Sequence, residues 1–251
     1  MPLPPETQSP KSSLPVLKPA VKPLPMGLPI RKVAKQFPAG FQFTEEMGWI
    51  PEGWEVKALD KIAEYKNGLA LQKFRPNPGE TPLPIVKIAQ LKNGEATWDE
   101  LASPNISPEC IIHDGDMVFS WSGSLMIDIW CGGKAALNQH LFKVTSTDFP
   151  KWFYLYWSIE HLYSFQRIAA DKAVTMGHIK RSHLSDVNCA IPDKYLLVKG
   201  SEITNPYIEK MINNRVQNKA LSNLRDTLLP KLISGEIRIP EAEKLTEEVL
   251  A

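Results

Sequence analysis

Two stretches of this sequence hold residue types that can read a nucleic acid. The first gathers hydroxyl, aromatic and amide side chains around predicted strand ends, namely Ser120, Trp121, Ser122, Asn138 and Gln139. An Asn or Gln amide presents a donor beside an acceptor, which matches the major-groove edge of adenine, and serine can bond to bases or phosphates. The same residue types dominate tight turns. The pattern alone therefore leaves a DNA-reading edge and a simple hairpin as alternatives.

The second stretch, residues 172–183, is the densest basic patch of the central region. Its candidate contacts are Lys172, Thr175, His178, Lys180 and Arg181. Arginine and lysine can pair with guanine O6 and N7 or hold phosphates, and Gly177 allows close backbone approach. A solvated loop is the alternative, because charged runs are often just that. The pattern favours contact with DNA.

Metal chemistry is poorly supported by the remaining polar residues. Asp114 and Asp116 flank Gly115 ahead of a predicted strand; such carboxylates can hold magnesium, but the pattern is also typical of a turn. His178 and His183 are five positions apart, with Lys180 and Arg181 between them, and cations there oppose a bound metal ion. We expect no metal site.

Catalytic motifs are missing as well. The sequence contains no phosphate-binding loop, no dinucleotide-binding glycine pattern, no nucleophile elbow and no zinc-protease motif. It also lacks the Asn/Asp-Pro-Pro-aromatic stretch that adenine and cytosine aminomethyltransferases use. We expect a protein that is not an enzyme and that holds no cofactor of its own.

Charge and cysteine content set broader limits. The formal net charge is +1, so composition alone does not indicate a nucleic-acid partner, since many DNA-binding proteins are strongly basic. Cys110, Cys131 and Cys189 are widely spaced and form no CxxC pair, which favours buried thiols in a reducing compartment. No apolar run is long enough to cross a membrane, and the first residues are proline-rich rather than signal-like. These features predict a cytoplasmic protein.

Composition divides the chain before its long helix into two regions. Residues 1–43 hold ten of the 22 prolines and six Lys or Arg with one acid, which predicts a disordered or polyproline-like lead-in. Residues 44–203 predict a compact, β-rich α+β domain with a helix over 150–170. Its expected strands are 85–89, 117–122, 125–130, 141–145 and 187–192, with a tight turn at Ser122-Gly123.

Residues 204–234 predict one long helix, followed by a C-terminal tail over 235–251. Thr204 or Asn205 is the expected cap, Pro206 fits the first turn, and Ser234-Gly235 is the expected stop. Apolar residues recur every fourth position, so the stripe they form drifts by about 40° per step around the helix. We expect this helix to exceed what its own domain needs and to pack on a partner helix, with docking on its own domain as the alternative. The predicted interface is Ile208, Ile212, Val216, Leu221, Leu224 and Leu228.

Several of these segments together resemble type I restriction–modification specificity subunits. The similar stretches, spread over about residues 43–240, are 49–59, 115–124, 136–144, 175–184 and 224–237. The resemblance implies a target-recognition domain followed by a spacer helix, with double-stranded DNA as ligand. It also implies methyltransferase (M) subunits and a motor/endonuclease (R) subunit as partners. S-adenosylmethionine, ATP and magnesium are then expected only in those partner subunits.

The sequence departs from the family pattern in holding one recognition domain rather than two. Residues 37–48 resemble the stretch that leads into the second domain of a full subunit, so the chain resembles a C-terminal half. Such a half would read one part of a bipartite target, as a homodimer or paired with another half-subunit through the helix. The alternative is an interaction module that does not read DNA, or an inactive gene remnant, that pairs through its long helix.

Overall fold

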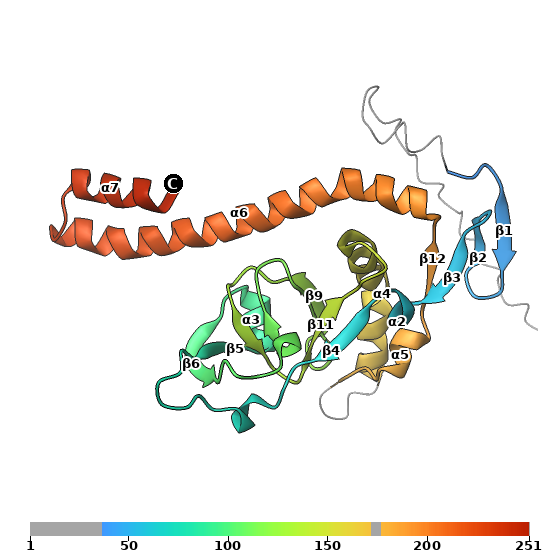
Figure 1. Ribbon diagram of the computed structural model, residues 1–251, viewed down its shortest axis with the longest axis horizontal. Coiled ribbons are helices and arrows are strands. Elements are labelled where there is room, and N and C mark those ends of the chain that lie inside the picture. Colours follow the sequence, from blue (N-terminus) through green and yellow to red (C-terminus); the bar gives the residue numbers. More distant parts are fainter. Residues whose placement is uncertain (1–36, 172–176, 251) are drawn as a thin grey trace, which may run out of the picture.

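The computed structural model describes residues 37–171 and 177–250 (Figure 1). Most of the lead-in, for which disorder is predicted, lies outside the described residues. Its last residues contradict that prediction, because β1 (Phe41–Thr44) pairs antiparallel with β2 (Gly48–Pro51). Phe43 and Trp49 lie opposite each other in this pair, with their rings edge to face at 5.6 Å, a contact that stabilises the hairpin.

Two four-stranded sheets form the β-rich domain (Figure 1). One is antiparallel throughout, in the order β4 (Glu64–Asn67), β11 (Leu141–Thr145), β8 (Met117–Ser120) and β9 (Met126–Ile129). The other has a parallel β5–β10 pair and runs in the order β6 (Thr97–Ala102), β5 (Leu83–Val86), β10 (Ala135–Leu137) and β7 (Ile111–Ile112). A further pair joins β3 (Glu55–Ala58) to β12 (Asn188–Ile191).

The predicted turn is confirmed, and so are the predicted strands, except that the run 85–89 stops being a strand after Val86 and a short helix begins at Ile88. Each of the five expected strands overlaps an observed one, respectively β5, β8, β9, β11 and β12. The chain turns between β8 and β9 at Ser122-Gly123, where Gly123 adopts φ +63°, a left-handed conformation that glycine tolerates. Short helical segments connect the strands: α2 (Leu59–Ile62), η1 (Leu71–Lys73), α3 (Ile88–Asn93), η2 (Pro108–Cys110) and α5 (Ser182–Ser185).

Helix α4 (Lys151–Asp171) matches the helix predicted over 150–170 and closes the main core. Phe165 is fully buried and lies 6.0 Å from the Phe119 ring of β8, so the helix packs directly on the antiparallel sheet. Its other side stays open, because Tyr156 and Tyr163 are exposed. The three cysteines are free and buried, as predicted, and burial raises the pKa of the Cys189 thiol to about 12.

Helix α6 (Lys194–Ser234) begins about ten residues earlier than predicted. Asp193 is the true cap, because its Oδ1 accepts a 2.7 Å hydrogen bond from the Leu196 amide. Thr204 and Asn205 are therefore helical residues, and Pro206 lies inside the helix. The predicted end is confirmed, since Gly235 follows Ser234 with φ +73°.

The expected C-terminal tail is a helix, α7 (Ile239–Leu250), which contacts α6 and lies alongside it (Figure 1). This changes the predicted partner interface. Ile208 is buried and Ile212 packs against the main core. This part of α6 therefore docks on its own domain, which was the alternative to packing on a partner helix. Leu228 is buried as well, while Val216 and Leu221 are exposed and Leu224 is half-buried. None of the helices described here is long and apolar enough to cross a membrane.

Candidate nucleic-acid interface

The end of β8 lies beside the start of β11, because these strands run antiparallel with Ser120 opposite Leu141. The Trp121 amide donates to the His140 carbonyl over 3.4 Å, and Ser122 Oγ lies 3.1 Å from His140 Nδ1. Residues 120–122 and 138–140, which are far apart in sequence, therefore occupy one corner of the sheet.

The basic stretch joins the same corner. Ser122 and His178 form an antiparallel bridge. On either side of it, the Gly123 amide donates to the Gly177 carbonyl (2.8 Å) and the Ile179 amide donates to the Trp121 carbonyl (3.0 Å). Residues 120–123, 138–140 and 177–181 thus form one surface, which we call the recognition edge. The two stretches predicted separately from the sequence lie together in the structure.

Aromatic rings lie at the centre of the recognition edge. The Trp121 ring lies 5.8 Å from that of His140 and 6.4 Å from that of His178, between ring centroids. Phe142 supports it from the sheet at 5.8 Å. Rings fixed in this way present apolar area at little cost in side-chain entropy when a ligand binds.

Three of the predicted contacts have structural roles instead. Ser120 is fully buried, and its hydroxyl donates to the Ser122 carbonyl over 3.1 Å, so it holds the turn and does not face a ligand. Asn138 is also buried, and its Oδ1 accepts from the His140 amide over 3.2 Å. Ser122 is buried as well, and its hydroxyl lies against His140, so it orients that ring and does not face a ligand. Gln139 is half-buried, and His178 and Lys180 are exposed on the surface.

Arg181 is tied to the domain rather than free to move. Its guanidinium donates to the Tyr65 carbonyl over 2.8 Å and lies 5.3 Å above the centre of the Phe142 ring. The Tyr65 side chain is buried, with its hydroxyl 2.8 Å from Ser158 Oγ, and burial raises the pKa of this hydroxyl. Arg181 positions the loop that carries Lys180. Lys172 and Thr175 lie outside the described residues.

A cleft of about 360 Å³ adjoins the recognition edge. Its polar lining residues are Gln72, Lys87, Glu100, Asn138, Gln139 and His140, and the rest are apolar. Lys87 is paired with Glu100, so its charge is partly compensated. Gln72 was missed by the sequence reasoning. The available signal was the run Gln72-Lys73-Phe74-Arg75, a polar and basic segment ahead of the first predicted strand.

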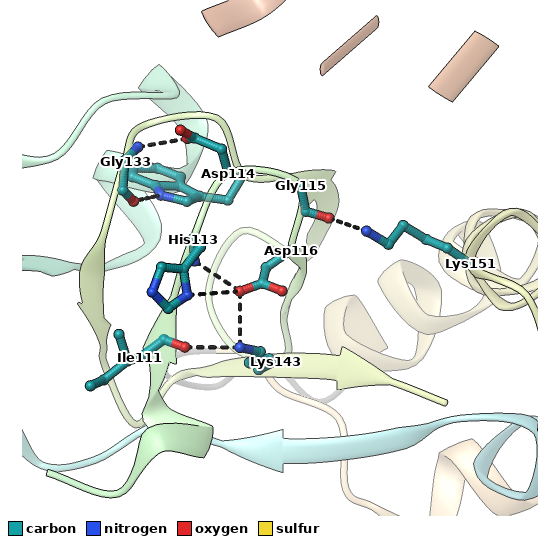
Figure 2. Close-up of polar contacts among 9 residues, drawn as sticks. Ile111, His113, Asp114, Gly115, Asp116, Gly133, Lys143 and Lys151 are labelled. Carbon is teal, nitrogen blue, oxygen red and sulfur yellow. Dashed lines mark hydrogen bonds and ion pairs between the residues drawn. The ribbon is translucent and has the colours of Figure 1, made fainter. Parts of the chain in front are cut away.

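The Asp-Gly-Asp segment is a turn (Figure 2). Asp114 Oδ1 accepts from the Gly133 amide at 2.7 Å, and Asp116 Oδ2 accepts from the His113 amide and from Lys143 at 2.8 and 2.9 Å. Gly115 has φ +89°, and Lys151 donates to its carbonyl over 2.6 Å. Both carboxylates are therefore engaged within the protein. Across the described ranges, no three His, Cys, Asp or Glu residues are grouped to hold a metal ion.

Comparison with known proteins gives one family. Residues 51–220 match the model of the type I restriction modification DNA specificity domain. Among curated proteins, the chain is 27% identical over 201 residues to the type I restriction enzyme MjaIX specificity subunit of Methanocaldococcus jannaschii, covering 76% of this chain and 46% of that protein. It is 23% identical over 195 residues to the HindI specificity subunit of Haemophilus influenzae, covering 75% of this chain and 42% of that protein.

The chain thus spans less than half the length of these curated relatives. Among solved structures, it is similar to the HsdS subunit from Thermoanaerobacter tengcongensis, at 15% identity and a TM-score of 0.43, covering 88% of this chain and 48% of that one.

Proposed function

The chain belongs to the family of type I restriction modification DNA specificity domains, and from that membership we propose that it reads one part of a bipartite DNA target. The observation that carries the proposal is the recognition edge. Three segments, 120–123, 138–140 and 177–181, are bound to one another by backbone hydrogen bonds and present amide, imidazole and ammonium groups together. A surface fixed in this way loses little entropy on binding DNA.

Base reading in this proposal falls to the side chains nearest the cleft. The Gln139 amide offers the donor and acceptor pair that matches adenine, and Gln72 provides a second amide in the same cleft. Lys180 and His178 lie on the exposed part of the edge, where a cation meets phosphate. The net charge of +1 is consistent with a small set of local phosphate contacts rather than a broad basic surface.

Catalysis is assigned to other chains in this proposal. M subunits would methylate adenine with S-adenosylmethionine, and an R subunit would use ATP and magnesium to move along DNA and cut it. This chain would direct them to the target and is proposed to be non-catalytic and cytoplasmic.

Two copies of the chain would supply the two halves of the target. The exposed apolar side chains of α6 beyond residue 215 are Val216, Leu221, Leu229 and Ile233. A two-fold pairing through this surface would place two recognition edges in inverted orientation, so the target would consist of two identical inverted halves. Pairing with another half-subunit would instead give two different halves.

The decisive experiment is DNA pull-down with sequencing, using the chain mixed with its cognate M subunit and S-adenosylmethionine. Lys180→Glu should reduce recovery of bound DNA, because it places a carboxylate against phosphate. Lys210→Glu, the same charge change at an exposed position on α6, is the matched control and should bind like the parent. Gln139→Ala should relax sequence preference at one base pair of the recovered motif.

Enrichment of a split motif with inverted identical halves supports the dimer, and one short half-site supports a single domain with a different partner. No enrichment from a folded complex contradicts DNA reading. That result would favour the second candidate, an interaction module or gene remnant, for which the exposed apolar surface of α6 is the supporting observation.

A further inference from the structure

An aromatic groove lies on the side of the domain formed by α4, the end of β12 and the start of α6. Its volume is about 430 Å³, and its main lining residues are Trp54, Trp152, Tyr156, Trp157, Glu160 and Pro192. The recognition edge shares no residue with this lining. The groove therefore requires an explanation other than DNA reading.

The groove is held open by packing around its tryptophans. Gly200 of α6 lies against the Trp152 ring, where a Cβ would approach to 2.6 Å, and Trp152 Nε1 donates to Ser201 Oγ over 2.9 Å. Trp157 stacks on His161 with ring centroids 5.7 Å apart. These contacts fix the rings while Tyr156, which is 55% exposed, stays available at the rim. A rigid row of aromatic rings is the kind of surface that binds proline-rich segments in the polyproline II conformation.

The chain leads into this groove directly from its proline-rich segment. Phe37, the first described residue, lines the groove and lies 5.8 Å from the Trp54 ring. The backbone just after it is fixed by the Glu52 amide, which donates to the Gly40 carbonyl over 3.0 Å. Residues 1–36 therefore connect to the molecule at the groove itself, and they contain nine prolines.

The charge of the proline-rich segment is complementary to that of the groove. Residues 1–36 carry six Lys or Arg and one acid, and Glu160 places a carboxylate in the groove lining. An aromatic groove bordered by a carboxylate selects prolines followed by a cation, and Pro23-Leu24-Pro25 precedes Arg31 and Lys32.

One donor in the groove also needs an acceptor. Trp54 Nε1 is buried without a hydrogen-bond partner among the described residues. A buried N–H left unpaired is costly, and the carbonyls of a polyproline II segment are free to accept because that conformation has no internal hydrogen bonds.

We propose that the groove binds the chain's own proline-rich segment, residues 19–32, with Pro23 and Pro25 against the tryptophans and a basic residue beside Glu160. The reach is sufficient, because the twelve residue steps from Pro25 to Phe37 span about 37 Å in polyproline II geometry. Binding within one chain needs no second partner and is favoured by the high effective concentration that a short connection gives.

The test uses the full chain with a photo-reactive benzoylphenylalanine in place of Leu24. Irradiation followed by mass spectrometry should give cross-links to residues 152–160 and 192–200 within one chain. Cross-links mainly elsewhere on the domain, or cross-links that join two chains, would overturn the proposal.

Tryptic cleavage after Arg31 and Lys32, at the end of the bound segment, is an independent readout. Cleavage should be about fivefold faster in Tyr156→Ala and in Glu160→Lys than in the parent, because both release the segment from the groove. Tyr163→Ala on the same helix and Glu209→Lys on α6, both exposed and outside the groove lining, should cleave like the parent. Equal rates in all five proteins would overturn the proposal. Thermal melting checks that each variant is folded. If Tyr156→Ala does not fold, the Glu160→Lys variant still tests the proposal.

Discussion

The two ends of α6 differ in what they pack against, although they belong to one helix. The proximal half, residues 194–215, packs against the main core through Ile208, Met211 and Ile212. The distal half, residues 216–234, faces the domain across a polar cleft of about 470 Å³ lined by Arg215, Lys219 and Asp226 among others. It contacts α7 instead (Figure 1).

The drift of the apolar stripe explains this difference. Leu228 lies 20 residues after Ile208, and at 100° per residue the two side chains point about 200° apart around the helix. Both are buried: Ile208 belongs to the main core of the domain, whereas Leu228 lies in the distal half of α6, which contacts α7. In Figure 1, α7 and the domain lie on opposite sides of α6. A stripe that looks continuous in sequence therefore serves two surfaces, and the side chains between them, Val216 and Leu221, are exposed.

Truncation of the proximal half should give the largest effect. Ile208→Ala removes a buried side chain from the main core and should lower the free energy of unfolding by about 2–4 kcal/mol. Ile233→Ala, at a position 79% exposed in the distal half, should change it by less than about 0.5 kcal/mol. Urea denaturation measures both. Equal losses would show that the two halves are stabilised alike and remove the distinction.

Charges placed on the distal half should act on association instead of stability. The double variant Leu221→Asp and Leu229→Asp should raise the dimer Kd about a hundredfold, because it places carboxylates in an apolar interface. Sedimentation measures the effect, with Tyr163→Asp on α4 as an exposed aromatic control. A parent protein that sediments as a single chain at micromolar concentration contradicts the proposed dimer.

The boundary between the halves is marked by Arg215, and its removal should have a smaller effect. Its guanidinium donates to Asp128 Oδ1 at 2.7 Å and to the Ile129 carbonyl at 3.1 Å, both at partly exposed positions. Solvent screening limits this pair, so Arg215→Ala should cost about 1 kcal/mol. Lys219→Ala, whose Nζ is 3.9 Å from Glu95, is the control and should cost less than about 0.5 kcal/mol. A double-mutant cycle with Asp128→Ala separates the direct pair from indirect effects.

Acidification should weaken the domain through His161 of α4. Burial lowers the pKa of this imidazole, whose Nε2 lies 3.0 Å from the Asn188 carbonyl. The folded state therefore favours the neutral ring, while the unfolded chain takes up the proton at its usual pKa of 6.5. Stability is complete above that pH and declines as the pH falls from 6.5 toward the lowered pKa.

His161→Gln should flatten this decline, which urea denaturation between pH 7.5 and 5 would detect. The unfolding of α6 and α7, followed by a label attached to the distal half of α6, should not show this pH dependence. An unchanged slope in the variant would assign the pH dependence to other groups.

The recognition edge was only partly predictable from the sequence. Residue types indicated both stretches, but their meeting depends on the β8–β11 register and on the bridge between Ser122 and His178. The burial of Ser120 and the bond of Arg181 to the Tyr65 carbonyl depend on neighbours far away in sequence. A composition-based reading could not separate a serine or arginine that builds the surface from one that faces a ligand.

The sequence by itself determined the features that depend on near neighbours along the chain. These are five of the strands (β5, β8, β9, β11 and β12), the Ser122-Gly123 turn, the helix stop at Gly235 and the spiralling apolar stripe of α6. Only the tertiary structure decided where α6 begins, because Asp193 follows β12, whose end is fixed by pairing with the distant β3. It also decided which surfaces bury Ile208 and Leu228. Periodicity states how far apart two side chains point, whereas the partner that covers each of them is set by contacts between residues distant in sequence.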